Sequence, residues 1–318
     1  MSAAPTPIPG SEPAPKRSRR GSVPRGTVWV FLAPFLLLTM VFVIYPLTQS
    51  AVLATQQTYG PSAKTFVGAE NFTNIASDPV FWKSVRNTII YAMGSLFIQL
   101  PLALMLALAL NSPRLRGRSV YRLIFFSPQL MGLVFVSILA TLMFEKQAGL
   151  VNQAIHMVLG GLGTSDGMTS WLDYPWLESR VMPTLILISL WMYVGFNMVY
   201  FLAALQSVDA SLLEAAEIDG AGPLARFWHV TVPAIRPVAS FVVMLSMIGS
   251  LQLFELPYVL LDGSGGPNNQ GLTVVMYLFQ SGFEVGDLGY ASAIGWALSL
   301  MLIGLALLQF WLMRRDEA

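Results

Sequence analysis

The sequence predicts an all-α membrane protein that crosses the bilayer six times. Of its 318 residues, 55% are hydrophobic and only 11% are charged, and the mean hydropathy is +0.62. These values are atypical of a soluble globule. The apolar residues also gather into six segments, each near the twenty residues or so that a helix needs to cross roughly 30 Å of hydrocarbon. The predicted spans are residues 28–47, 88–110, 123–144, 183–205, 238–261 and 289–313.

Proline occurs inside or at the edge of several predicted spans. It removes a backbone donor and is poorly tolerated in helices exposed to water, but packed membrane helices accommodate it by kinking. We therefore expect kinks near these positions. They are Pro34, Pro46, Pro101, Pro128 and Pro257.

Most of the 18 lysines and arginines fall on one side of the predicted spans. Cytoplasmic loops carry an excess of these residues, so that side is predicted to be the cytoplasm. Both termini are then cytoplasmic, and the protein is predicted to be a multi-pass component of the inner or plasma membrane. The cations on this side are Lys16, Arg17, Arg19, Arg20, Arg25, Arg114, Arg116, Arg118, Arg122, Arg226, Arg236, Arg314 and Arg315.

The N-terminal residues 1–27 are rich in Pro, Ser and Arg and show no apolar periodicity. They are predicted to form a disordered basic cytoplasmic tail ahead of a transmembrane domain at 28–318. The alternative is a secretory signal cleaved near Val52–Ala54. That alternative fits less well, because the first apolar run exceeds the usual 7 to 15 residues and five more spans follow.

Several chemistries are excluded by composition. The chain has no cysteine, so disulfides and Cys-type zinc sites are absent, and its two histidines, His156 and His229, lie in different predicted loops. No Gly-x-x-x-x-Gly-Lys-Ser/Thr loop is available to hold ATP phosphates. A net charge of +1 gives no indication of nucleic-acid binding. No catalytic, metal-binding or cofactor-binding residues are therefore predicted.

The most informative segment is the polar loop at 206–237, between the fourth and fifth spans. Asp209 or Ser211 can cap a short helix over 212–217. Gly220 suits the left-handed residue that ends such a helix.

A second short helix is predicted to follow. Gly222 precedes Pro223, which fits the first turn of a helix running toward Val230. Pro233 and Pro237 are predicted to stop that helix before the fifth span begins. The loop is thus predicted to be a helix-turn-helix elbow on the cytoplasmic face.

The loop resembles the EAA loop in membrane subunits of ABC importers, where glutamate, two small residues, a later glycine and a proline recur at this spacing. The resemblance implies that a cytoplasmic ATPase grips the elbow, with Glu214 facing a cation on the ATPase and Asp219 bracing the turn. The alternative is an amphipathic helix that rests on lipid headgroups. The residues that carry the pattern are Glu214, Ala215, Ala216, Asp219, Gly220, Ala221 and Pro233.

Other segments resemble carbohydrate-importing permeases of the maltose and glycerol-phosphate type. The resemblance implies the type I ABC importer permease fold, in a heterodimer with a second permease subunit. It further implies two ATPase subunits that use ATP and Mg, an extracytoplasmic sugar-binding protein and a sugar substrate; this chain itself would be no enzyme. The segments are 66–72, 82–88, 110–118, 195–198, 203–207 and 254–267.

A translocation path is predicted mainly in the fourth span. Ser189, Tyr193 and Asn197 recur every four residues and share one helix face, which could line a polar cavity. The resemblance to maltose-type subunits implies sugar contacts at Ser189, Met192, Tyr193 and Gln252. Alternatively, these polar residues only bond neighbouring helices.

Glu255 is the one acid well inside a predicted span, and Gln252 is predicted to share its helix face. Its carboxylate should face water, a cation or a partner, in gating, helix pairing or substrate contact. Alternatively, it is a hydrated structural acid near the outer surface. The small residues Gly94, Ser95, Ser246, Gly249 and Ser250 are explained by close helix approach alone.

Two other function classes, a secondary transporter and an intramembrane enzyme, fit the sequence less well. An ion-coupled secondary transporter of a small polar solute would use intramembrane charges and often an inverted repeat, whereas this chain has one clearly internal acid and no evident repeat. An intramembrane enzyme would need a nucleophile and base, or metal ligands, at membrane depth. No such group occurs within the six predicted spans.

Overall fold

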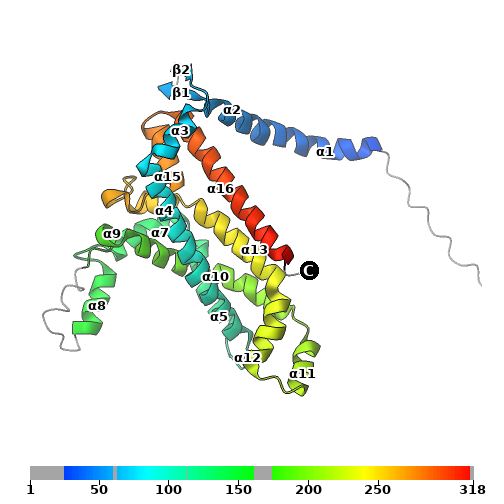
Figure 1. Cartoon of the computed structure of the whole chain (residues 1–318). Helices are drawn as coiled ribbons and strands as arrows, with labels where there is room; N and C mark the ends of the chain where they lie inside the picture. Colours follow the sequence, from blue (N-terminus) through cyan, green and yellow to red (C-terminus); the bar gives the residue numbers. More distant parts are fainter. Residues whose placement is uncertain (1–24, 60–62, 113, 161–173, 316–318) are drawn as a thin grey trace, which may run out of the picture. The chain divides into compact units, whose positions relative to one another are not determined.

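In the computed structural model the described residues are 25–59, 63–112, 114–160 and 174–315, and most of them are helical (Figure 1). The chain divides into two compact units, residues 1–49 and 50–318. Among these described residues, five helices are long and apolar enough to cross a membrane, or six if one bent pair counts as a single span.

The first unit contains α1 (Arg25–Thr39), a π-helical turn and the start of α2 (Tyr45–Leu53). The apolar stretch Trp29–Leu53 is the first candidate span. Most of the predicted tail lies outside the described residues, and its last three residues, 25–27, belong to α1.

The second unit holds the other spans. Their elements are α4 (Pro79–Gly94), η2 (Ser95–Gln99) and α5 (Leu100–Asn111); α10 (Val181–Gln206); α12 (Pro223–Arg226), η5 (Phe227–Thr231) and α13 (Val232–Leu251); and α16 (Leu288–Arg315). Here η2 and η5 are single π-helical turns within otherwise α-helical spans.

The predicted span at 123–144 is not one helix. It consists of α6 (Arg118–Phe126), a 3-10 turn and α7 (Leu133–Met143), with a bend of 96°. Pro128 is the second residue of the 3-10 turn, and Met131 and Gly132 then take extended backbone conformations. The kink expected at Pro128 is confirmed, but it develops into a complete break because two consecutive residues leave the helical conformation.

The prediction that Pro233 and Pro237 stop a helix is wrong. The helix runs from Pro223 through both prolines to Leu251. The π-helical turn η5 directly precedes Pro233, and local π adjustments re-satisfy backbone groups that a proline frees. The predicted span at 238–261 is instead interrupted at its other end, where residues 252–254 separate α13 from α14 (Glu255–Leu260).

The structure also contains short elements that the sequence did not predict, and Figure 1 places β1, β2 and α3 at the end opposite the elbow. The two strands pair antiparallel, from Gln56 opposite Phe66 to Tyr59 opposite Ala63. These elements are β1 (Gln56–Tyr59), β2 (Ala63–Phe66), α3 (Glu70–Ser77), α8 (Leu150–Gly160), α9 (Trp176–Ser179) and α15 (Val274–Phe279).

A partly buried network of hydrogen bonds joins α15 to the spans α4 and α16. Asp78 caps α4 by accepting the Val80 N–H at 2.8 Å, and its other oxygen accepts the hydroxyls of Tyr277 and Tyr290. Burial raises the pKa of the Asp78 carboxyl, but the hydrogen bonds from the tyrosines and from the backbone outweigh burial, so the pKa is lowered overall. Burial and the bond to Asp78 raise the pKa of Tyr277 to about 12.

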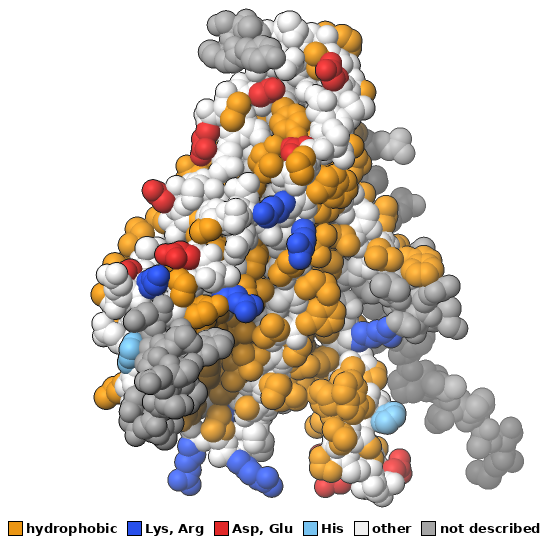
Figure 2. All heavy atoms as spheres, turned by 60° about the vertical axis from the view of Figure 1, so that its left-hand side comes forward, with side chains coloured by type: hydrophobic (Ala, Val, Ile, Leu, Met, Phe, Trp, Pro, Cys, Tyr) orange, Lys and Arg blue, Asp and Glu red, His pale blue; other side chains and the backbone are white. Residues whose placement is uncertain are grey.

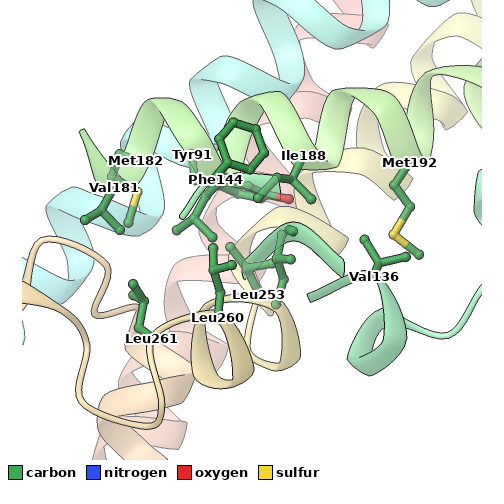
Figure 3. Close-up of a cluster of buried hydrophobic side chains, with 13 residues drawn as sticks. Tyr91, Val136, Phe144, Val181, Met182, Ile188, Met192, Leu253, Leu260 and Leu261 are labelled. Carbon is green, nitrogen blue, oxygen red and sulfur yellow. The ribbon is translucent and has the colours of Figure 1, made fainter. Parts of the chain in front are cut away.

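Helix α10 is the centre of the core. Its first half packs against α7 and α14, with Met192 beside Val136 of α7 and Val181 near Leu261, which directly follows α14 (Figure 3). Its second half packs against α5 and α13. A third apolar cluster joins α4 to α15 and α16. Because α10 belongs to two of the three clusters, groups on its surface occupy fixed positions relative to the neighbouring spans.

Candidate functional site

The elbow consists of α11 (Ala210–Ile218) and α12, and the structure decides which residue caps it. Asp209 Oδ1 accepts the Ser211 N–H at 2.9 Å, so Asp209 is the cap and Ser211 is not. Hydrogen bonds from the backbone and hydroxyl of Ser211 lower the pKa of the Asp209 carboxyl. The cap therefore stays ionised at neutral pH.

The turn after α11 has the predicted geometry. Gly220 is left-handed, with φ +82°. Its N–H donates to the Glu217 carbonyl at 3.0 Å, and the Ala221 N–H donates to the Ala216 carbonyl at 2.9 Å. This pair of bonds is the Schellman motif, which fixes the angle at which the chain leaves a helix.

The side chain that braces the two helices is Glu217, which accepts a hydrogen bond from Arg226 on α12. Within the described part of the chain, Asp219 makes no side-chain hydrogen bond; its N–H donates to the Ala215 carbonyl. The Glu217 carboxylate is well exposed, so this ion pair adds little stability by itself. The backbone turn is the main determinant of the elbow angle.

The elbow presents apolar side chains to its surroundings. Exposed fractions are 54% for Leu212, 86% for Ile218, 72% for Leu224 and 58% for Trp228. Exposed carboxylates of Glu214 and Glu217 lie on the same short helix, α11, and Figure 2 shows hydrophobic and acidic side chains together at the lower end of the molecule. Exposed apolar area next to charge is typical of a protein interface.

A cavity of about 240 Å³ opens between three of the spans. Its wall carries hydroxyl and amide groups, small residues and aromatic rings. The lining residues are Tyr91, Ser95, Gln99, Tyr193, Phe196, Asn197, Leu245, Ser246, Gly249, Ser250 and Leu253.

Of the four path residues predicted on α10, Tyr193 and Asn197 line this cavity. Ser189 is 1% exposed, donates to the Ile186 carbonyl at 2.9 Å and shares a hydrogen bond with the Tyr91 hydroxyl. Ser189 thus fits the alternative, in which polar residues bond neighbouring helices. Met192 packs in the apolar cluster on the first half of α10.

Gln252 and Glu255 do not line this cavity. The helix ends at Leu251, and Gln252 has φ −98° and ψ 14°, so the predicted shared face of Gln252 and Glu255 does not exist. Glu255 lies exposed in the first turn of α14. Glu255 directly follows the interruption between α13 and α14. At this position its carboxylate can face water or a partner, whereas on a continuous lipid-facing helix it would face hydrocarbon.

Cavity residues on the second and fifth spans were missed as functional candidates. Tyr91, Ser95 and Gln99 are spaced four apart, like Tyr193 and Asn197, and this spacing could have identified them. Ser95 and Gln99 are the first and last residues of the π-helical turn η2. Such turns often occur at functional sites.

Close helix approach explains only some of the small residues. A Cβ added at Gly94 would lie 2.6 Å from Ile186 Cδ1, so this glycine does allow close packing. A Cβ added at Gly249 would meet nothing within 4 Å. Gly249 lines the cavity together with Ser95, Ser246 and Ser250, so for these four the packing explanation is incomplete.

Comparison with known proteins identifies the family. Residues 99–315, from the end of η2 through the elbow to the end of α16, match the family model described as "Binding-protein-dependent transport system inner membrane component". The chain belongs to this family. It is therefore a permease subunit, a membrane component of a transport system and not an enzyme, and a solute-binding protein and an ATPase are its partners.

Individual relatives agree with the family assignment. The permease is 37% identical over 291 residues to the lactose transport system permease protein of Rhizobium radiobacter, covering 91% of this chain and 94% of that protein. It is 34% identical over 281 residues to the arabinooligosaccharides transport system permease protein of Bacillus subtilis (strain 168), covering 88% and 86%.

The fold also matches a solved structure. A chain in a bacterial alginate ABC transporter, crystallised with an alginate pentasaccharide-bound periplasmic protein, superposes with a TM-score of 0.75. The match covers 92% of the permease and 95% of that chain at 20% identity, which supports the fold alone. The ABC importer permease fold is confirmed, and the ion-coupled alternative is not favoured.

Proposed function

We propose that this permease forms half of the translocation path of an ATP-driven sugar importer. A second, related permease subunit would supply the other half, two ATPase subunits that bind ATP and Mg would dock on the elbow, and a sugar-binding protein would dock at the opposite end. The observation that carries the proposal is the elbow itself, an exposed, apolar and acidic surface on a rigid turn between α10 and α13.

The elbow is mechanically linked to the cavity. Helix α12 continues through η5 into α13 without interruption, from Pro223 to Leu251, and Ser246 and Ser250 near its far end line the cavity. On the other side of the elbow, α10 contributes Tyr193 and Asn197. A displacement of the elbow would therefore move two cavity walls together, as alternating access requires.

The cavity suits a sugar. Hydroxyl and amide groups such as those of Ser95, Gln99 and Asn197 can hydrogen-bond to sugar hydroxyls, and Tyr91 and Tyr193 offer aromatic rings. Its volume of about 240 Å³ is below the roughly 300–1,000 Å³ of typical small-molecule sites. A second subunit facing this cavity would complete it. The names of the relatives contain lactose and arabinooligosaccharides. We therefore propose sugars of this class, disaccharides and oligosaccharides, as the substrate.

We further propose that the elbow and both termini are cytoplasmic. Leu115, in the arginine-rich loop between α5 and α6, packs on the same apolar cluster as Val208, which directly precedes the elbow. The two loops therefore lie at one end of the bundle. Their combined arginines favour the cytoplasmic side.

The coupling role can be tested at Ala215, which is exposed on α11. Ala215→Leu adds bulk to the surface offered to the ATPase and leaves the internal packing of the permease intact. The matched control is Ala154→Leu, at an exposed position of α8, away from the elbow. Both variants are reconstituted with the partner subunits in vesicles, and sugar uptake and ATP hydrolysis are measured.

Uptake by the Ala215→Leu complex is expected to fall by about fivefold or more, since overpacking of a tight contact costs about 1–3 kcal/mol. The Ala154→Leu complex should transport like the wild type. Full uptake and normal ATPase co-purification with Ala215→Leu would rule out the elbow as the coupling surface.

A further inference from the structure

Four arginines, which we call the arginine cluster, lie in the loop after the second span and on α6. Arg114 and Arg116 are exposed in the loop, and the other two lie on α6. No acidic residue occurs between Asp78 and Glu145 in the sequence. The cluster consists of Arg114, Arg116, Arg118 and Arg122.

Internal ion pairs do not neutralise this charge. Within the described residues, no carboxylate lies in an ion pair with any member of the cluster. The Nε–H of Arg122 is buried, yet no acceptor among the described atoms takes its hydrogen bond. Figure 2 shows Lys and Arg side chains that protrude at the lower end of the molecule, apart from acidic side chains.

Apolar side chains that face outward accompany the arginines on α6. Exposed fractions are 60% for Val120, 63% for Leu123 and 56% for Ile124. Behind them, Leu115 and Phe125 pack on the apolar cluster shared by α5, α10 and α13, which fixes the segment against the transmembrane bundle. Guanidinium groups and exposed aliphatic side chains thus lie on the same helix, α6, at the start of the third predicted span.

We propose that the arginine cluster binds an anionic phospholipid of the adjacent leaflet, with the headgroup phosphate among the guanidinium groups and an acyl chain along Val120, Leu123 and Ile124. A planar guanidinium matches a phosphate oxygen pair, and clustered cations at a membrane boundary attract anionic lipid. Alternation of arginines with exposed aliphatic residues complements a molecule that is charged at one end and apolar at the other. The elbow, in contrast, offers acidic and apolar groups and suits a protein.

The proposal goes beyond transport and is tested by binding alone. The purified full-length permease in detergent is titrated with phosphatidylglycerol or phosphatidylcholine, and bound lipids are counted by native mass spectrometry. Phosphatidylglycerol is expected to bind about tenfold more tightly. Because exposed charges are screened by salt, this preference should shrink at about 0.5 M NaCl.

The test variant is Arg114→Gln/Arg116→Gln/Arg118→Gln/Arg122→Gln, which should lose the preference for phosphatidylglycerol. The matched control removes the same number of charges in the loops predicted to lie on the opposite side and should retain the preference. The control is Lys64→Gln/Lys83→Gln/Arg86→Gln/Lys146→Gln.

If the fourfold variant does not insert, Arg114→Gln/Arg116→Gln serves instead, because both side chains are exposed; its preference should fall by about threefold. An unchanged preference in the variants, or equal binding of both lipids by the wild type, would overturn the proposal. Loss of the co-purifying ATPase with an unchanged lipid preference would also overturn it, since the cluster would then be a protein interface.

Discussion

Two glycines in the elbow offer a test of its geometry. Gly220 has φ +82°, whereas Gly222 has φ −67° and ψ 167°, which any residue adopts. A Cβ added at either position meets no atom within 4 Å. Gly220→Ala and Gly222→Ala therefore make the same chemical change with the same absence of steric contact, and they differ only in backbone conformation.

The structure gives the size of the effect. An alanine held in the left-handed conformation at position 220 costs about 1–2 kcal/mol. Relief of that strain would break the two turn hydrogen bonds, from Gly220 to Glu217 and from Ala221 to Ala216. Gly222→Ala is expected to be neutral, or to stabilise by about 0.4–1 kcal/mol through the unfolded chain. The cost at position 220 corresponds to a factor of about 5–30 in the population of the native elbow.

The assay is the affinity of the detergent-purified permease for its ATPase subunits, followed by uptake in vesicles. Docking needs the elbow in its native form, so Gly220→Ala should weaken ATPase binding by up to about 30-fold. Gly222→Ala should bind like the wild type. Equal affinity of the two variants would refute the reasoning, because it would mean that the left-handed turn does not set the docking geometry.

Two further predictions concern stability. Gly195→Ala should lower the free energy of unfolding of the permease by about 1–3 kcal/mol, because the added Cβ would lie 1.8 Å from the Phe125 carbonyl oxygen. The control is Gly249→Ala, whose Cβ would have open space around it and which should show no loss of stability. Asp78→Asn should cost about 1 kcal/mol at neutral pH, since a partly exposed carboxylate loses charge-assisted hydrogen bonds. The lowered pKa of Asp78 means that this stabilisation is present above the unfolded pKa and is lost as pH falls through the folded pKa. Unfolding scans at neutral pH and near pH 3 should therefore show the two proteins converging in acid, and a constant difference would contradict the assignment.

Two features of the membrane helices differ from what the sequence predicted, namely the polar face of α10 and the prolines near the elbow. Of the polar stripe predicted on α10, Tyr193 and Asn197 line the cavity and Ser189 does not. Membrane helices are apolar on most sides, so a polar stripe does not reveal which neighbour it meets. Ser189 turned out to face Tyr91, while Asn197, two turns further on, faces the cavity. The prolines near the elbow were judged by their behaviour in water-exposed helices, and a π-helical turn accommodated them instead.

What the sequence determined by itself is local. Apolar length sets the candidate spans, the arginine bias predicts their sidedness, and Asp209, Gly220 and Pro223 specify the elbow because caps and left-handed turns depend on a few adjacent residues. Only the tertiary structure decided which side chains line the cavity, since its walls come from three spans far apart in the chain and each contributes only part of its surface. The break in the third predicted span was likewise settled by packing, because α7 is held against α10 and α14 and not in line with α6.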